Sequence, residues 1–179
     1  MASFPALETL GPRIMVLGPT NSGKSTLAAA LGARLGIPSI HLDQFRHLPG
    51  TDWQQRPDTD FRALHDEAIA RPEWVMDGSY SRLMPQRLAR TTAIIVLDDS
   101  LAVRTARYFR RTLGRQQRAG GLEGNRDSIK WDMLAWLWKT RNKSQHARDL
   151  ATRSGLPAVF CHDRRELDAL YAAWGLARP

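Results

Sequence analysis

The chain has 179 residues, of which 42% are hydrophobic and 25% charged, and this balance suits one globular domain over residues 1–179 and excludes a disordered chain. The formal net charge of +8 points to phosphate-bearing ligands, with nucleic acid and ATP as the candidates. No apolar stretch approaches the roughly 18 residues of a membrane span, and the N-terminus lacks the pattern of a signal peptide. The single Cys161 cannot form an internal disulfide. We therefore expect a cytoplasmic protein.

Short apolar runs alternate with helical patterns along the whole chain. Strands are expected where the apolar runs are short and bounded by polar residues, and helices where apolar residues recur every three or four positions. Glycine and proline mark the connections, and the segment richest in glycine should be mobile. In chain order the prediction is strand 13–17, helix 25–35, strand 39–42, a turn-rich loop over 44–58, helix 59–70, strand 74–76, helix 85–90, strand 93–97, helix 101–113, a glycine-rich segment 114–125, helix 129–148, strand 158–161 and helix 166–174.

This alternation predicts the fold class. Strands that alternate with helices form an α/β fold in which a parallel sheet is connected by right-handed crossovers. In such a sheet the ligand binds beyond the carboxyl ends of the strands. Four of the expected strands end at a glycine or an aspartate, namely Gly18, Asp43, Asp77 and Asp98. The topology therefore predicts that these four residues converge.

One motif carries a specific chemical meaning. Gly18-Pro19-Thr20-Asn21-Ser22-Gly23-Lys24-Ser25 fits the phosphate-binding pattern G-x-x-x-x-G-K-[ST] at every fixed position. Its glycines let the backbone wrap around phosphate oxygens, while the loop N–H groups and the following helix attract the anion. Lys24 is expected to reach the β- and γ-phosphates, and Ser25 to bind Mg²⁺. A chance match is the alternative, but the strand before the motif and the helix after it favour nucleotide binding.

Three aspartates at strand ends are candidates for the rest of the site. Asp77 can hold Mg²⁺ or its water beside the phosphate loop, and Asp98 is a weaker candidate for the same role. Asp43 can orient a hydroxyl group of an acceptor or take its proton. For each of the three, the alternative is an ordinary turn or helix-capping aspartate.

The positive charge is concentrated between residues 101 and 148. This segment holds twelve cations against three acids, hence +9, and the rest of the chain is about neutral. Arginines recur there every three or four residues and would repel one another along a helix unless an anion is bound. A lid over residues 107–128 that closes on a transferring phosphoryl group fits this pattern, with a solvated basic face as the alternative. The recurring arginines are Arg104, Arg107, Arg111, Arg115 and Arg118.

The tryptophans, the cysteine and the histidines are expected to have structural roles more than chemical ones. Most of Trp131, Trp136 and Trp138 are expected in the core, and Cys161 within a buried strand. The histidines His41, His47 and His65 have no cysteine or histidine partners at ligand spacing, so no structural zinc is predicted.

At these residues the sequence resembles the P-loop small-molecule kinases, namely the adenylate, shikimate and gluconate kinases. Within them it most resembles the bacterial adenylate kinase-like proteins of the DNA topology modulation (FlaR-like) group. The segments that carry the resemblance are Gly18 to Thr26, Ile40 to Gln44, Leu48 to Gly50, Trp74 to Arg82, Ile94 to Asp98 and Trp131 to Trp138, and the similarity covers roughly residues 13–170.

The resemblance implies a five-stranded parallel sheet in the order 2-3-1-4-5 within three α/β/α layers, an arginine lid, ATP and Mg²⁺. It implies that residues Gly18 to Thr26 bind the nucleotide, that Arg104 stacks on adenine, and that Arg107, Arg110 and Arg111 approximately match lid arginines. Asp43 matches the acidic residue that binds a hydroxyl acceptor in shikimate and gluconate kinases.

The acceptor side departs from one of these relatives. Asp77-Gly78 matches an adenylate kinase motif that ends in Pro-Arg, but Ser79-Tyr80-Ser81 stands before Arg82 here, which weakens an AMP assignment. The resemblance leaves Arg56, Arg62 and Arg82 as candidates to bind an anionic acceptor, and Asp77 as a further candidate to bind the substrate.

Three functions remain open from the sequence. The first is an ATP- and Mg²⁺-dependent kinase of a hydroxylated metabolite or nucleotide, with Lys24, Asp43, Arg107 and Arg111 as catalytic residues and Ser25 and Asp77 as metal ligands. The second is a nucleotide-binding regulator associated with nucleic acid, supported by the basic segment. The third is a motor-type ATPase or a GTPase switch, ranked last because the chain is short and lacks a guanine-reading N-K-x-D motif. The acceptor and the oligomeric state stay open.

Overall fold

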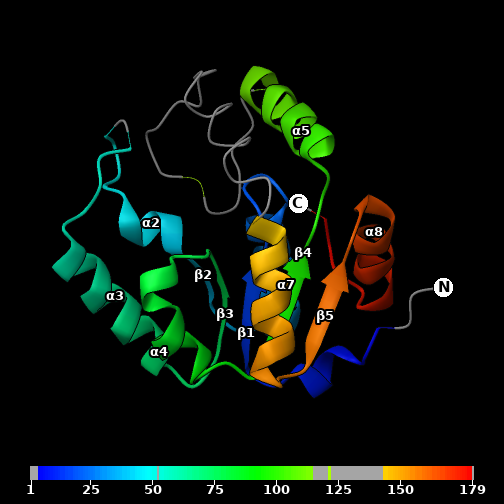
Figure 1. Ribbon diagram of the computed structural model, residues 1–179, viewed down its shortest axis with the longest axis horizontal. Helices are drawn as coiled ribbons and strands as arrows, with labels where there is room; N and C mark the ends of the chain where they lie inside the picture. Colours follow the sequence, from blue (N-terminus) through cyan, green and yellow to red (C-terminus); the bar gives the residue numbers. More distant parts are fainter. Residues whose placement is uncertain (1–3, 52, 115–120, 122–142, 179) are drawn as a thin grey trace.

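The structure is a computed structural model, shown in Figure 1, and it describes residues 4–51, 53–114, 121 and 143–178. Strands and helices alternate in it as the sequence predicts. The elements are η1 (Leu7–Leu10), β1 (Arg13–Leu17), α1 (Lys24–Leu35), β2 (Ser39–His41), α2 (Leu42–Arg46), α3 (Asp58–Ala70), β3 (Trp74–Asp77), η2 (Ser81–Leu83), α4 (Met84–Leu88), β4 (Ala93–Leu97), α5 (Leu101–Gly114), α7 (Lys143–Ser154), β5 (Ala158–Cys161) and α8 (Arg164–Ala173).

The five strands form one sheet in the order β2-β3-β1-β4-β5, and every pair is parallel. This confirms the predicted fold class and strand order. The register places Asp77 on β3 opposite Val16 on one side and opposite His41 on the other. Because parallel strands end at the same edge, the segments after β1, β2, β3 and β4 meet at one edge of the sheet.

Helices cover both faces of the sheet (Figure 1), and the alternation of side chains along each strand explains how. On β1, Ile14 and Val16 face a core that contains residues of α1 and α8, whereas Met15 and Leu17 face a core that contains residues of α3 and α7. Both faces of the central strands are therefore buried, which is why these strands are continuous apolar runs and lack an alternating pattern.

The sequence prediction missed the short helical elements of the structure. The segment predicted as a loop over 44–58 contains the short helix α2, which begins at Leu42 directly after β2. Asp43 therefore lies in the first turn of a helix and does not end a strand. Its helix is only five residues long, too short to show a periodic pattern in the sequence. The 3-10 helix at Leu7–Leu10 was also not predicted.

Several predictions concern residues outside the described ranges. They include most of the lid over residues 107–128, the tryptophans between 131 and 138, and the first part of the helix predicted over 129–148. The described residues 143–148 of that prediction lie in α7, which continues to Ser154, beyond the predicted end. Cys161 is buried at the end of β5, as predicted. Within the described ranges, no helix has the length and apolar character that crossing a membrane requires.

Candidate nucleotide-binding site

The phosphate-binding motif forms the connection between β1 and α1. Gly18 has φ 142°, and a Cβ atom at this position would lie 2.3 Å from the carbonyl oxygen of Leu97, so only glycine fits between the two strands. Helix α1 begins at Lys24, which leaves the N–H groups of its first turn at the end of the loop. The fold therefore supplies the strand, loop and helix that the motif requires.

Basic side chains gather on the backbone of this loop. Nζ of Lys24 donates to the carbonyl oxygen of Pro19 over 2.8 Å. Nε of Arg104 donates to the carbonyl oxygen of Thr20 over 2.8 Å, and Nη1 of Arg107 lies 3.4 Å from that of Asn21. Three successive carbonyl groups of the loop thus contact positive charges. The arrangement brings a lysine and two arginines to the place where the motif would bind phosphate.

Arg104 is a buried arginine beside the loop. Only 1% of it is exposed, and burial lowers the pKa of its guanidinium, an effect that Asp98 and Asp99 oppose. The side chain is held between the loop after β1 and the aspartates after β4. In this position Arg104 holds the backbone of the loop at Thr20.

Ser25, Asp77 and His41 form a hydrogen-bonded chain at the carboxyl ends of β2 and β3. Oγ of Ser25 donates to Oδ2 of Asp77 over 2.7 Å. Nδ1 of His41 lies 2.5 Å from Oδ1 of the same carboxylate. Asp77 is buried, with 5% of its surface exposed. The structure therefore brings together the two residues that the sequence singled out for Mg²⁺, although they are 52 positions apart.

The chemistry of Ser25 and Asp77 fits Mg²⁺. A hydroxyl and a carboxylate are oxygen donors of the kind that this hard cation prefers, and the cation usually completes its six positions with water and substrate phosphates. Oγ of Ser25, in the first turn of α1, and Oδ2 of Asp77, at the end of β3, are two such oxygens in contact. Among the described residues there is no group of three or more acidic, histidine or cysteine side chains that could hold a metal without water or phosphate ligands.

The aspartates after β4 bind arginines from two helices. Asp98 forms an ion pair with Arg148 on α7, and Asp99 forms one with Arg107 on α5. Neither aspartate caps α5, because the N–H of Val103 donates to Oγ of Ser100. Asp98 therefore acts as an anchor for α7 in this structure, and Asp99 fixes the guanidinium of Arg107 beside the phosphate loop.

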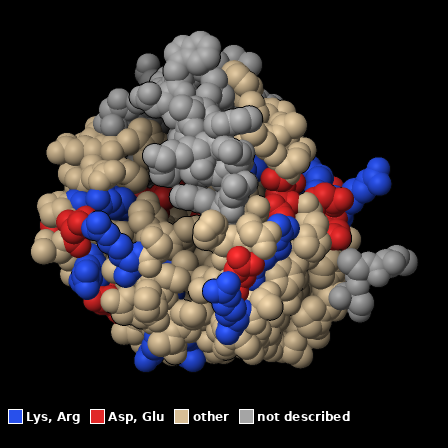
Figure 2. Space-filling model, viewed as in Figure 1, with Lys and Arg blue, Asp and Glu red and all other residues tan. Residues whose placement is uncertain are grey.

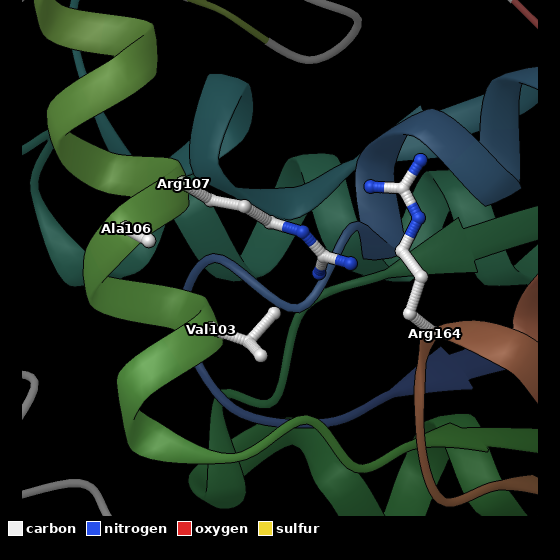
Figure 3. Close-up of a pocket in the computed structure, with 4 residues that line it drawn as sticks. All are labelled: Val103, Ala106, Arg107 and Arg164. Atoms are coloured by element: carbon white, nitrogen blue, oxygen red, sulfur yellow. The ribbon is translucent and has the colours of Figure 1, made fainter.

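A hollow of about 190 Å³ lies beside Arg107. Its lining is Val103, Ala106 and Arg107 from α5 together with Arg164 from the first turn of α8. Figure 3 shows Arg107 extending from α5 toward Arg164, with Val103 projecting into the space between the two elements. An apolar wall between two guanidinium groups suits a flat aromatic ring. The sequence did not single out Arg164, because charged residues at a helix start look like ordinary solvated ones.

Tyr80 and Asp43 meet on the other side of the sheet edge. The hydroxyl of Tyr80 donates to Oδ1 of Asp43 over 2.6 Å, and its ring packs on Phe61 with centroids 4.9 Å apart. Burial and the nearby Asp43 raise the pKa of Tyr80, so the phenol stays protonated and keeps donating. Tyr80 has φ 30°, an unusual conformation for a residue with a side chain.

Gly78, two residues before Tyr80, occupies a position that only glycine fits. Gly78 has φ 120°, and a Cβ atom there would lie 2.9 Å from Cβ of Leu42. The loop after β3 therefore passes close against the start of α2, which is how Tyr80 reaches Asp43.

The arginines predicted for an anionic acceptor are placed differently from one another. Nε of Arg56 donates to the carbonyl oxygen of Phe45 over 2.9 Å, so this side chain holds the loop after α2. Arg82 is exposed and lies 3.6 Å from Asp58, and Arg62 is exposed on α3. Arg111 lies on α5, but its side chain is outside the described residues. The structure thus leaves Arg62 and Arg82 accessible and uses Arg56 within the fold.

Arg87 on α4 is an unpredicted buried charge beneath the site. It is fully buried, its Nη2 donates to the carbonyl oxygen of Ser79 over 2.7 Å, and Nε lies 3.2 Å from Sδ of Met15. Burial lowers the pKa of this guanidinium to about 10, although Asp77 opposes the shift. Arg87 therefore fastens the backbone that leads from Asp77 to Tyr80.

Comparisons with known proteins agree on the fold. No family model and no curated protein matches the chain. A sugar kinase from a Janibacter species matches in structure with a TM-score of 0.53 and 15% identity, over 93% of this chain and 96% of that one. Shikimate kinase from Acinetobacter baumannii, in complex with shikimate, matches with a TM-score of 0.50 and 16% identity, over 93% and 95% of the two chains. The chain therefore has the α/β fold of the P-loop kinases.

Proposed function

We propose that the protein is an ATP- and Mg²⁺-dependent kinase of a small molecule. One observation carries this proposal: Ser25 of the phosphate-binding motif and Asp77 of the neighbouring strand share a hydrogen bond at the mouth of the phosphate loop. Ser25 and Asp77 would hold Mg²⁺, which would supply positive charge to offset that of the nucleotide phosphates. The similarity in fold to a sugar kinase and a shikimate kinase over nearly the whole chain supports the same function.

The positive groups around the loop would stabilise the phosphoryl group during transfer. In kinases of this kind the transferring group is loosely bonded in the transition state, so positioning and electrostatic stabilisation do most of the catalysis. Lys24 would move from the carbonyl of Pro19 to the β- and γ-phosphates, a short displacement for a flexible side chain. Arg107 lies close enough to the loop to contribute charge, and Arg111 is proposed for the same role from its place on α5.

The hollow between α5 and α8 is the proposed site of the base. Its volume of about 190 Å³ is below the range of whole-ligand pockets, which suits one ring system of a larger nucleotide. Arg164 would stack against the base, and Val103 would supply the apolar edge. In this proposal Arg164 takes the base-contacting role that the sequence suggested for Arg104, which is buried against Thr20.

Asp43 and Tyr80 mark the proposed acceptor side. The carboxylate of Asp43 is partnered by a phenol and by no cation among the described residues around it. A carboxylate in that state can accept a hydrogen bond from an acceptor hydroxyl and take its proton as phosphate is transferred. A hydroxylated metabolite is therefore the preferred acceptor class, and exposed Arg62 and Arg82 could bind an anionic group that it carries.

The test is transfer of the γ-phosphate. The purified protein would be incubated with Mg²⁺ and γ-labelled ATP in a desalted and replenished pool of metabolites that includes sugars and nucleoside monophosphates. Lys24→Ala is the control, because it removes the phosphate-binding charge and leaves the loop backbone in place. A labelled small molecule that forms with the wild type and is lost in the variant supports the proposal. Binding of ATP without any labelled product would contradict it.

Nucleic-acid association is a second candidate, favoured by the net charge of +9 between residues 101 and 148. On the face shown in Figure 2, basic and acidic side chains intermix over the described surface. A duplex-binding protein would lose affinity steeply as salt rises. Binding that keeps this salt dependence at saturating ATP would indicate a separate nucleic-acid site. If ATP abolishes the binding, the arginines serve the nucleotide.

A further inference from the structure

His41 reaches the candidate metal site from the edge strand of the sheet. It is the last residue of β2, and the register pairs it directly with Asp77 on β3. The imidazole is buried, with 9% of the residue exposed, and Nδ1 lies 2.5 Å from Oδ1 of Asp77. The two oxygens of the Asp77 carboxylate therefore have separate partners, His41 on Oδ1 and Ser25 on Oδ2.

This division has a physical consequence for Asp77. An ionised carboxylate can only accept hydrogen bonds, so Nδ1 is the nitrogen that carries the proton in this pair. A donor fixed on Oδ1 restricts rotation of the carboxylate and keeps Oδ2 directed at Ser25. Hydrogen bonds of this kind orient the groups around bound metals, and their loss typically weakens metal binding about 10- to 100-fold.

Packing alone would not require this contact. His65, a fully buried histidine on α3, shows what a packing role looks like: Nδ1 contacts Asp66 on the same helix, and Nε2 has no partner among the described residues. His41 instead directs its ring nitrogen from β2 to the Asp77 carboxylate on the neighbouring strand β3. The acidic, histidine and cysteine side chains of the described ranges form no separate metal cluster that would explain it.

We propose that His41 is a positioning residue that orients Asp77 for Mg²⁺ in the complex with ATP. The proposal rests on the proposed function, because it takes Ser25 and Asp77 as the protein groups that serve the metal. His41 itself does not touch the metal or the nucleotide in this role. It acts by holding one oxygen of Asp77 so that the other stays beside the phosphate loop.

The test measures how much the metal strengthens ATP binding. The dissociation constant of ATP would be measured by calorimetry in EDTA and again in saturating Mg²⁺, and the ratio of the two values is the metal enhancement. His41→Leu removes the donor and keeps an apolar side chain of similar bulk. His41→Asn places an amide N–H near the position of Nδ1. Ser25→Ala removes a proposed metal ligand, and His146→Leu is the matched loss of an exposed histidine.

The expected result is a metal enhancement that falls about tenfold or more in His41→Leu. His41→Asn should keep most of the enhancement, His146→Leu all of it, and neither His41 variant should change ATP binding in EDTA. The inference is overturned if His41→Leu keeps the wild-type enhancement while Ser25→Ala loses it. It is also overturned if His41→Leu weakens ATP binding equally with and without metal, which would indicate general damage to the fold. A wild type without metal enhancement would overturn both this inference and the proposed function.

Discussion

The hydroxyl of Tyr80 donates to Oδ1 of Asp43 over 2.6 Å and so joins the loop after β3 to the first turn of α2. The bond lies across the proposed acceptor side of the sheet edge. Tyr80 has φ 30°, and Gly78 in the same loop approaches Leu42 closely. Strain of this kind persists where the surrounding structure imposes it, and it is often found at functional sites.

Tyr80→Phe should weaken use of the acceptor and leave nucleotide binding unchanged. The ring keeps its contact with Phe61, but the carboxylate of Asp43 loses the hydrogen bond that the Tyr80 hydroxyl donates. A hydrogen bond to a charged group is worth about 1.5–3 kcal/mol. The expected loss is therefore roughly 10- to 100-fold in kcat/KM for the acceptor. Steady-state kinetics with the acceptor and calorimetry with ATP measure the two effects. Tyr171→Phe, at a buried tyrosine on α8, is the matched control. Unchanged acceptor kinetics in Tyr80→Phe would remove Tyr80 from the site.

Arg164→Ala should weaken binding of ATP but not of tripolyphosphate. The proposed stacking of a guanidinium on the base is worth about 0.5–2 kcal/mol, which corresponds to roughly a 2- to 30-fold rise in the dissociation constant of ATP. Tripolyphosphate has no base and should bind Arg164→Ala and wild type alike. Arg165→Ala is the control, because Arg165 is the next exposed residue of the same helix and does not line the hollow. An equal loss for both ligands would place Arg164 among the phosphate contacts.

His65 should make the fold less stable in mild acid. Burial lowers its pKa below the usual 6.5, so the unfolded chain takes up a proton before the folded one does. The free energy of unfolding is therefore highest above pH 6.5 and falls as the pH drops below that value, by at most about 1.4 kcal/mol per pH unit for one proton. Thermal unfolding from pH 8 to pH 5 would measure the slope. His65→Leu should show a shallower acid slope than the wild type; an identical slope would mean that other groups cause it.

Arg87 should tolerate loss of its charge better than loss of its volume. Arg87→Met removes a charge that burial disfavours, and the new side chain packs beside Met15 and Met84. The substitution also leaves the carbonyl of Ser79 without its donor. Because these effects oppose each other, the free energy of unfolding should change by less than about 2 kcal/mol. Arg87→Ala adds a cavity and should cost about 3 kcal/mol or more. Denaturant unfolding measures both, with exposed Arg90→Ala as the control. Equal losses in Met and Ala variants would show that the charge itself stabilises the fold.

The strands and the phosphate loop were predictable because each depends on local sequence. Residues 14–17 of β1 are apolar throughout, and the motif from Gly18 to Ser25 is typical of a loop between a strand and a helix. Asp77 could be singled out for the same reason, since it closes a buried strand.

The partners of these residues could not be predicted, because they depend on strand order and register. His41 meets Asp77 only because β2 lies beside β3 with these two residues in register. Arg164 lines the hollow only because α8 follows β5 at the same sheet edge as α5. Arg87 has the sequence context of an exposed helical arginine, and nothing local marks it as buried.

The fate of the γ-phosphate tests the central claim most directly. Labelled ATP, Mg²⁺ and the metabolite pool would be mixed with wild type, Lys24→Ala and Asp43→Asn, and the label would be divided between organic phosphate and inorganic phosphate. We predict that wild type forms a labelled organic phosphate, that Lys24→Ala forms it at least about 100-fold more slowly, and that Asp43→Asn shifts the remaining label toward inorganic phosphate. Label that reaches only inorganic phosphate with the wild type, or that stays in bound ATP, would contradict the assignment as a small-molecule kinase.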